Sequence, residues 1–266
     1  MSVSRALKIS GQSRRLSGRS RRPPPSPGVA FYDLDGTLVD LNLVHAAVFL
    51  FANLGEWTGR LRYLLSFAAR LPLLYMAEQT DRRQLNTVLF EAFRGVSRDR
   101  LATLGEEYCE RVLLRHLYPQ AREIVEANRR IGLEAVLVSG SPDFIIAPFA
   151  ERLNIRDFAA NRLVFNGGLA TGRLQAPIMA GEDKAQWCDA YAAEHRVSLE
   201  SCWGYADSYY DLPFLAIVGH PVAVNPDRRL RAAARSRHWP ILSFAKATRS
   251  QSALDWQSFN IVMGGR

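Results

Sequence analysis

Three short apolar runs in this sequence each end in a cluster of polar residues, and this arrangement constrains the fold more than any other feature. The runs are GVAFY, EAVLV and SCWGYA, and they are followed by DLDGT, SGS and DS. Short apolar runs bounded by turn-forming residues are typical of buried strands. Helical stretches alternate with them, over residues 120–130, 143–153 and 184–195. We therefore expect an α/β fold with a parallel sheet and helices on both faces.

The polar clusters predict where the functional site lies. In open α/β sheets, ligands bind at the carboxyl ends of the strands, and all three clusters stand at such ends. HPVAV and WPILSF add two further candidate strands. The segment RLVFNGGLATGRL predicts a small β-hairpin that turns at Asn166, Gly167 and Gly168.

The spacing of the strands predicts the domain organisation. About 100 residues separate the first two strands, far more than a simple crossover needs, so we expect residues 41–118 to form an inserted helical cap. Residues 29–40 and 119–246 would form the core domain. Residues 1–28, rich in Ser, Arg, Gly and Pro, predict a disordered tail, although their composition also fits an organelle transit peptide. Residues 247–266 would be a C-terminal tail.

The net charge of +8 is concentrated in the first 28 residues. They contain no acid and seven basic side chains: Arg5, Lys8, Arg14, Arg15, Arg19, Arg21 and Arg22. Without these the remainder carries about +1, which gives no support for a nucleic-acid partner.

Cysteine usage and hydropathy bear on the compartment. Cys109, Cys188 and Cys202 are odd in number and widely spaced, so they predict neither a disulfide framework nor a metal cluster. A reducing compartment, the cytoplasm, is the simple interpretation. Arg62 and Arg70 interrupt the most apolar stretch, so no segment has the length of a bilayer-spanning helix, although peripheral membrane contact stays open.

Two carboxylates, Asp33 and Asp35, follow the first strand. Residues i and i+2 of an extended segment point to the same side, so both acids can face one pocket. Like charges at that distance are unfavourable unless a cation lies between them or one acid is protonated, and oxygen ligands suit Mg²⁺. The alternative is a turn in which Asp35, Gly36 and Thr37 cap the following helix.

The later clusters supply groups that phosphoryl transfer requires. Ser139 and Gly140 are expected to open a helix, where a hydroxyl and free N–H groups can hold phosphate oxygens, or simply to cap it. Lys184 begins a predicted helix and could balance the carboxylates, but it could equally be a surface charge. Asp207 and Asp211 could complete an oxygen-rich magnesium site, or could serve as a helix cap and a first-turn acid.

These four clusters, in this order and spacing, resemble the haloacid-dehalogenase (HAD) superfamily, subfamily IB, whose members include phosphoserine phosphatases. The resemblance covers residues 29 to about 245. It implies an α/β, Rossmann-like core with an inserted helical cap, and a Mg²⁺-dependent phosphatase acting on a phosphate ester.

The resemblance also implies roles for individual residues. Asp33 would be the nucleophile that forms an aspartyl phosphate, and Asp35 the general acid and base. Asp33, the backbone carbonyl of Asp35 and Asp207 would bind Mg²⁺, with Asp211 holding the water shell of the metal. Ser139 and Gly140 would bind phosphate oxygens, and Lys184 would both bind the phosphate and stabilise its developing charge.

Two features of the sequence bear on the substrate. Asn42 stands where phosphoserine phosphatases carry a glutamate that meets the substrate's amino group, so free phosphoserine is disfavoured. The apolar stretch over residues 61–77 could pack within the cap, line a pocket for a lipid phosphate, or insert at a membrane surface. Two other functions remain open: a phosphotransferase with the same chemistry, and a non-catalytic scaffold that keeps the fold.

Overall fold

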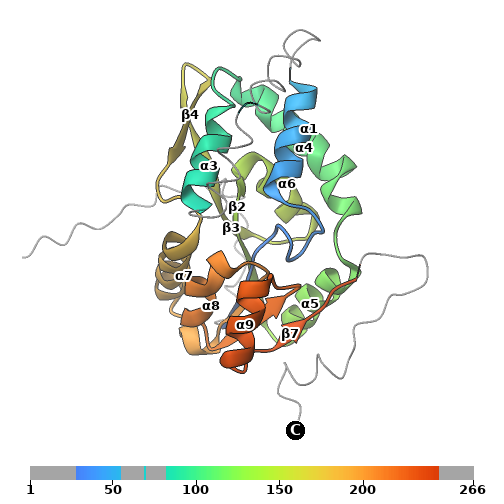
Figure 1. The fold of residues 1–266 in the computed structure, drawn as a ribbon, viewed down its shortest axis with the longest axis vertical. Coiled ribbons are helices and arrows are strands. Elements are labelled where there is room, and N and C mark those ends of the chain that lie inside the picture. Colours follow the sequence, from blue (N-terminus) through green and yellow to red (C-terminus); the bar gives the residue numbers. More distant parts are fainter. Residues whose placement is uncertain (1–27, 55–68, 70–81, 246–266) are drawn as a thin grey trace, which may run out of the picture.

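The computed structural model describes residues 28–54, 69 and 82–245 of the 266-residue chain, and these residues form an α/β fold (Figure 1). Within them, seven strands form one sheet in the order β4-β3-β2-β1-β5-β6-β7. The strands are β1 (Gly28–Tyr32), β2 (Leu133–Pro142), β3 (Asp157–Asn166), β4 (Leu169–Gln175), β5 (Trp203–Ala206), β6 (His220–Val224) and β7 (Ile241–Leu242). Every neighbouring pair is parallel except β3 and β4, so the predicted parallel sheet is confirmed.

Helices separate consecutive strands in the described residues, except that β3 is followed directly by β4. The α-helices are α1 (Leu43–Asn53), α3 (Arg82–Glu91), α4 (Arg98–Arg111), α5 (Pro119–Arg130), α6 (Asp143–Arg152), α7 (Gly181–His195), α8 (Leu212–Ile217) and α9 (Arg228–Ser236). Short 3-10 turns are η1 (Leu113–Arg115), η2 (Leu199–Ser201) and η3 (Tyr209–Asp211). The three helical stretches expected from the sequence are α5, α6 and α7. A proline at the first position of α5 fixes its start, because a helix leaves that N–H unpaired in any case.

The alternation of side chains along β1 divides the core between the two faces of the sheet. All five residues of β1 are buried. Ala30 and Tyr32 join an apolar cluster with residues of α5, α6 and the helices before them. Val29 and Phe31 point to the opposite face and join residues of α7, α8 and α9. The expected helices on both faces are therefore present.

Helices α1, α3 and α4, here called the cap helices, come between β1 and α5 in the chain. Figure 1 shows them together at one end of the molecule, with α7, α8 and α9 at the other. A backbone contact ties them to the hairpin of β3 and β4. The N–H of Gly95 donates to Ala170 O, that of Ala170 to Val96 O and that of Arg98 to Gly168 O, at 2.8, 2.8 and 2.9 Å. The hairpin therefore joins the cap helices to the sheet by hydrogen bonds, in addition to the covalent connections after β1 and before α5.

The predicted hairpin is present, but its first strand is longer than expected. β3 begins at Asp157, and its first residues pair in parallel with β2, from Val136↔Asp157 onward. The sequence DFAAN includes two polar residues, so apolar patterning alone did not reveal a strand there. As a consequence the hairpin continues the core sheet instead of forming a separate excursion.

Three segments lie wholly or almost wholly outside the described residues: the basic tail except Gly28, which begins β1, the C-terminal segment from residue 246, and nearly all of the apolar stretch over residues 61–77. Among the helices that are described, none is both long and apolar enough to cross a bilayer. Cys109, Cys188 and Cys202 are free thiols and buried.

Candidate active site

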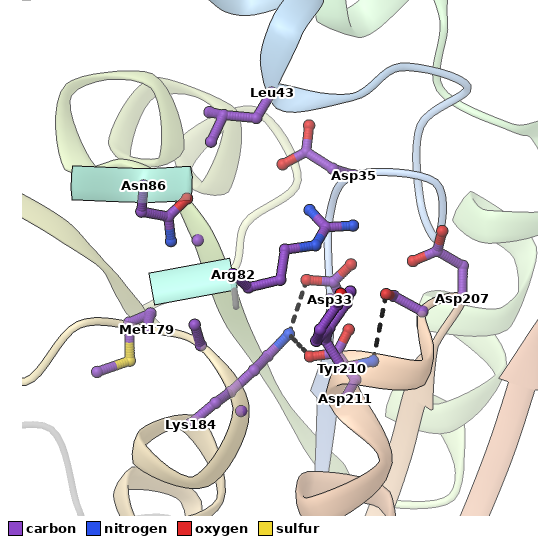
Figure 2. Close-up of a pocket in the computed structure, with 14 residues that line it drawn as sticks. Asp33, Asp35, Leu43, Arg82, Asn86, Met179, Lys184, Asp207, Tyr210 and Asp211 are labelled. Carbon is purple, nitrogen blue, oxygen red and sulfur yellow. Dashed lines mark hydrogen bonds and ion pairs between the residues drawn. The ribbon is translucent and has the colours of Figure 1, made fainter. Parts of the chain in front are cut away.

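A pocket lies at the carboxyl ends of β1, β2 and β5, beneath the cap helices (Figure 2). The sequence-predicted residues in its lining are Asp33, Asp35, Gly140, Lys184, Asp207 and Asp211. They come from segments spread over most of the described chain. The strand ends therefore bring together the groups that the sequence analysis singled out, with Ser139 as the exception discussed below.

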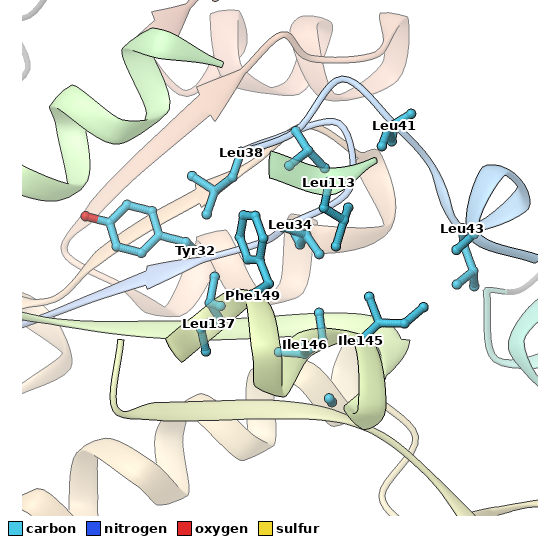
Figure 3. Close-up of a cluster of buried hydrophobic side chains, with 14 of the residues drawn as sticks. Tyr32, Leu34, Leu38, Leu41, Leu43, Leu113, Leu137, Ile145, Ile146 and Phe149 are labelled. Carbon is cyan, nitrogen blue, oxygen red and sulfur yellow. The ribbon is translucent and has the colours of Figure 1, made fainter. Parts of the chain in front are cut away.

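The loop after β1 holds Asp33 and Asp35 at the floor of the pocket. The N–H of Asp33 donates to the carbonyl of Tyr205 on β5, at 2.9 Å, so the first residue beyond the strand is still fixed to the sheet. Leu34 and Leu38 are buried in the apolar cluster on the other side of the loop (Figure 3). The loop therefore presents its acids to the pocket and its leucines to the core.

The alternative role of this turn as a helix cap is wrong. Helix α1 begins only at Leu43, and its cap is Asn42, whose side-chain oxygen accepts hydrogen bonds from the N–H groups of Val44 and His45 at 3.1 and 3.2 Å. The Asn42 side chain is exposed and engaged in capping. It is therefore not directed at the pocket.

Lys184 lies in the first turn of α7 and is almost fully buried, with 2% of its surface exposed. Its Nζ lies 2.7 Å from Oδ1 of Asp33 and 2.8 Å from Oδ1 of Asp211, as the dashed lines of Figure 2 show. The surface-charge alternative is therefore wrong. A buried ammonium needs such partners, because an isolated charge in the interior is strongly unfavourable.

Three carboxylates form a cluster beside this lysine. Asp33, Asp207 and Asp211 each offer an oxygen, and these atoms lie within 4.8 Å of one another. The Thr37 hydroxyl lies 3.3 Å from both Asp33 Oδ2 and Asp207 Oδ1, and can donate to either. Clustered carboxylate oxygens are the donor set that Mg²⁺ prefers, so the residues present fit that ion.

The close approach of the β1 loop to Asp207 depends on a glycine. Gly36 has φ +80°, in the left-handed region that favours glycine, and a Cβ at this position would lie 2.2 Å from Oδ2 of Asp207. Only a residue without a side chain allows the backbone to pass so near to that carboxylate.

The described lining of the pocket contains more acidic side chains than basic ones. Burial raises the pKa of Asp33, and the nearby Asp211 and Asp35 raise it further, while Lys184 lowers it. Burial followed by repulsion from Asp33 and Asp211 holds the pKa of Asp207 well above its usual range. Burial favours a neutral Lys184, but Asp211 and Asp33 outweigh that effect and raise its pKa. Added positive charge would therefore stabilise this pocket.

The second polar cluster lies on an extended strand, contrary to expectation. Ser139 and Gly140 belong to β2, and α6 begins only at Asp143, because the strand continues to Pro142. Gly140 lines the pocket, whereas Ser139 is fully buried and its Oγ accepts a hydrogen bond from the N–H of Ser141 at 3.0 Å.

Two residues that were not predicted from the sequence hold this cluster in place. Ser141 donates from its hydroxyl to Oδ2 of Asp35 at 2.7 Å. Asn161, buried on β3, donates to the carbonyl of Gly140 at 2.7 Å and accepts from the N–H of Met179 at 2.8 Å. Asn161 therefore joins the β2 end to the loop that precedes Lys184.

The cap also contributes residues that were missed. Arg82 and Asn86 lie one turn apart on α3, and both line the pocket. The helix buries Leu85 and Leu89 on the same side. A charged residue and an amide on the apolar side of an amphipathic helix were the signal that could have revealed them. Tyr210, from η3, completes this part of the lining.

Comparisons with known proteins agree with this geometry. The family model for haloacid dehalogenase-like hydrolases matches residues 30–216. Phosphoserine phosphatase SerB1 of Mycobacterium tuberculosis is 30% identical over 236 residues, which cover 88% of this chain and 77% of that protein. A Bordetella pertussis protein of unknown function has a solved structure with TM-score 0.70 and 26% identity, covering 82% of this chain and 98% of its own.

A fold match comes from a phosphoserine phosphatase solved as a phospho-aspartyl intermediate analogue. It has TM-score 0.61 and 15% identity, and covers 88% of this chain and 97% of that one. The matched family model, the similar phosphatase and the pocket of buried carboxylates lead to one conclusion: the chain belongs to the haloacid dehalogenase-like hydrolases and is a phosphatase of their phosphoserine-phosphatase-like group.

Proposed function

We propose that this phosphatase hydrolyses the phosphate monoester of a small or lipid-linked alcohol in two steps, through an aspartyl phosphate on Asp33. The observation that carries the proposal is the pairing of Asp33 with Lys184 at 2.7 Å inside a pocket that Asp35 also lines. A carboxylate that is buried, oriented and next to a second acid is suited to attack phosphorus, and forming a covalent intermediate replaces one difficult displacement by two easier ones.

In the first step an Asp33 oxygen bonds to phosphorus, and the bond from phosphorus to the alcohol oxygen breaks. Asp35 gives its proton to that oxygen. In the second step a water molecule attacks the phosphorus, Asp35 takes a proton from it, and the bond to Asp33 breaks, releasing inorganic phosphate. Burial raises the pKa of Asp35, which favours the protonated form that the first step needs.

Three other residues would stabilise the phosphoryl group. Lys184 balances the charge of Asp33 and of the phosphate oxygens that share its surroundings. Gly140 lines the pocket, so its backbone can approach a phosphate oxygen closely. Ser139, next to it in the strand, is the second phosphate-binding residue of the proposal.

Mg²⁺ is part of the proposal because of the unbalanced carboxylates. Asp33, Asp207 and the backbone carbonyl of Asp35 would hold the ion, with Asp211 in contact with its water ligands. When bound, the ion supplies positive charge that offsets the carboxylates and the phosphate. The raised pKa values of Asp33 and Asp207 support this, since both acids gain from a nearby cation.

The position of Asn42 bears on the substrate. Its side chain is a neutral amide that caps α1, so it supplies no charge to pair with an ammonium group. We therefore place free phosphoserine below esters of uncharged alcohols, whether small or lipid-linked.

The experiment measures phosphate release from p-nitrophenyl phosphate and a panel of phosphate esters, with and without Mg²⁺. We expect release that requires Mg²⁺ and that Asp33→Asn abolishes while the circular dichroism spectrum is retained. Asp189→Asn is the matched control, because Asp189 is exposed on α7. Release that persisted in Asp33→Asn would overturn the assignment of the nucleophile.

A further inference from the structure

Arg82 is a cation that the cap helices bring into the pocket. It is the first residue of α3, and Figure 2 shows its guanidinium extending toward the space between Asp33 and Asp35. Lys184 reaches Asp33 from the core helix α7, on the other side of this space. The two basic residues therefore approach the same region from different parts of the fold.

The guanidinium is attracted to the acids but does not pair with any of them. The pKa of Arg82 is raised because Asp211, Asp207, Asp33 and Asp35 together outweigh the effect of burial. Over the part of the chain that the structure describes, its Nε is buried without a hydrogen-bond partner and no ion pair within 4.0 Å forms. A buried N–H donor without an acceptor is unfavourable, and Arg82 is otherwise only half-buried, so the geometry is that of a site for an incoming acceptor.

The adjacent residues keep α3 in this position. Arg83 forms an ion pair with Asp183, the residue before Lys184, so α3 and the start of α7 are linked directly. The Arg82 guanidinium also lies over the ring of Tyr210, with 5.6 Å between its Cζ and the ring centroid. A planar cation supported on an aromatic face is restricted in orientation, which favours directed hydrogen bonds.

We propose that Arg82 binds the phosphoryl oxygens of the substrate from the cap side, so that none of the described cations of the pocket is left to pair with the leaving alcohol. This rests on the proposed function, in which Asp33 attacks phosphorus and Asp35 serves the leaving oxygen. The phosphoryl group must then lie between these two acids, where the guanidinium points. Its fork of N–H donors matches two oxygens of a phosphate.

The rest of the lining indicates the class of alcohol. Among the described residues on the cap side, Leu43 and Asn86 complete the pocket with an apolar side chain and an amide, and Met179 stands opposite. Once Arg82 is engaged with the phosphate, this lining leaves no cation for a carboxylate on the alcohol. The preferred substrate is therefore an ester of an uncharged alcohol.

Binding of inorganic phosphate tests the proposal independently of turnover. Calorimetric titration in the presence of Mg²⁺ would compare the wild type with Arg82→Gln, Arg82→Lys and a control. Arg94→Gln is the matched control, since Arg94 is an exposed arginine that follows the same helix and pairs with Glu91. We expect Arg82→Gln to weaken phosphate binding by about tenfold to a hundredfold, because a charge-assisted contact is lost. Arg82→Lys should restore part of the affinity, and Arg94→Gln should bind as the wild type does.

Two substrates separate the roles of phosphate and alcohol. Arg82→Gln should lower kcat/KM for p-nitrophenyl phosphate and for 3-phosphoglycerate by similar factors, because both carry the phosphate. The proposal is overturned if phosphate affinity and p-nitrophenyl phosphate hydrolysis are unchanged while 3-phosphoglycerate hydrolysis falls, since Arg82 would then contact the alcohol. Absence of hydrolysis in the wild type would reject the proposed function and leave the phosphate titration as a separate test of Arg82.

Discussion

The Ser141 hydroxyl donates a 2.7 Å hydrogen bond to Oδ2 of Asp35, across 106 positions of the chain. This contact joins the end of β2 to the loop after β1 and fixes the acid that the proposal assigns to proton transfer. It also stabilises the ionised form of Asp35, which lowers its pKa against the larger effect of burial. The serine is therefore a positioning residue for that acid.

Ser141→Ala should slow the reaction and shift its pH dependence. Losing the hydrogen bond removes an influence that lowers the pKa of Asp35, so the pKa rises further. The basic limb of the kcat/KM profile for an alkyl phosphate should move to higher pH, and kcat should fall about tenfold as the acid loses its orientation. Ser236→Ala, at an exposed position of α9, is the control. An unchanged pH profile would show that Asp35 does not depend on this contact.

Gly36→Ala should lower the affinity for Mg²⁺, beyond any loss of folding stability that an alanine at a left-handed position causes. A Cβ would lie 2.2 Å from Oδ2 of Asp207 and displace that carboxylate. Gly95→Ala is the matched control, because Gly95 has a similar φ of +84° but no atom within 4 Å of the point where its Cβ would lie. The control measures only the loss in free energy of unfolding that comes from placing alanine at a positive φ, about 1 kcal/mol. Mg²⁺ titration should show reduced affinity for Gly36→Ala alone, and equal affinities in the two variants would contradict this.

The sequence allowed the residues at strand ends to be placed well. Asp33, Asp35 and Asp207 meet because parallel strands put their carboxyl ends at one edge of the sheet, and both the strands and their order can be predicted from the sequence. The burial of Lys184 could not be read in this way. It depends on where α7 packs against the sheet.

Arg82 and Ser141 were not predicted, because their positions depend on tertiary structure. Arg82 reaches the pocket only because the cap helices lie beyond the carboxyl ends of the strands, and a single sequence does not show where an inserted segment lies relative to the sheet. Ser139 was expected to bind phosphate at a helix start, and no role was predicted for Ser141. Residues two apart on a regular strand point to the same side, but the pairing of β2 with β3 shifts in register between Val138 and Pro142, so the directions of Ser139 and Ser141 depend on an irregularity that apolar patterning did not define.

Stability should depend on pH and on Mg²⁺ in a linked way. The pKa values of Asp33 and Asp207 are raised by burial, so in the metal-free protein the folded state holds protons that the unfolded state releases above about pH 4. This contribution is present at low pH and is lost as pH rises through the raised pKa values.

Thermal unfolding from pH 5 to pH 8 measures this dependence. Mg²⁺ should raise Tm more at pH 8 than at pH 5, because the ion binds the ionised carboxylates. In Asp33→Asn the difference between the two pH values should shrink. A stabilisation by Mg²⁺ that is the same at both pH values would contradict the predicted linkage.

Asp183→Asn should raise KM by loosening the link between α3 and α7, with little change in the free energy of unfolding. The ion pair of Asp183 with Arg83 is partly exposed, so its loss should change the free energy of unfolding by about 1 kcal/mol or less. KM should rise, and its dependence on salt should weaken, because the link between α3 and α7 is gone. Glu107→Gln, which removes a similarly partly exposed ion pair with Arg111 on α4, is the control. If KM rises equally in both variants, this link is not specific.

The covalent step can be tested directly with Asp35→Asn and p-nitrophenyl phosphate. Its leaving group needs little protonation, so the first step should proceed in this variant, while hydrolysis of the aspartyl phosphate, which needs Asp35 as a base, should be slow. We predict a rapid burst of p-nitrophenol approaching the concentration of active sites, together with protein-bound phosphate that hydroxylamine removes, and neither in the double variant with Asp33→Asn. Steady phosphate release with no burst and no bound phosphate at any quench time would contradict the account.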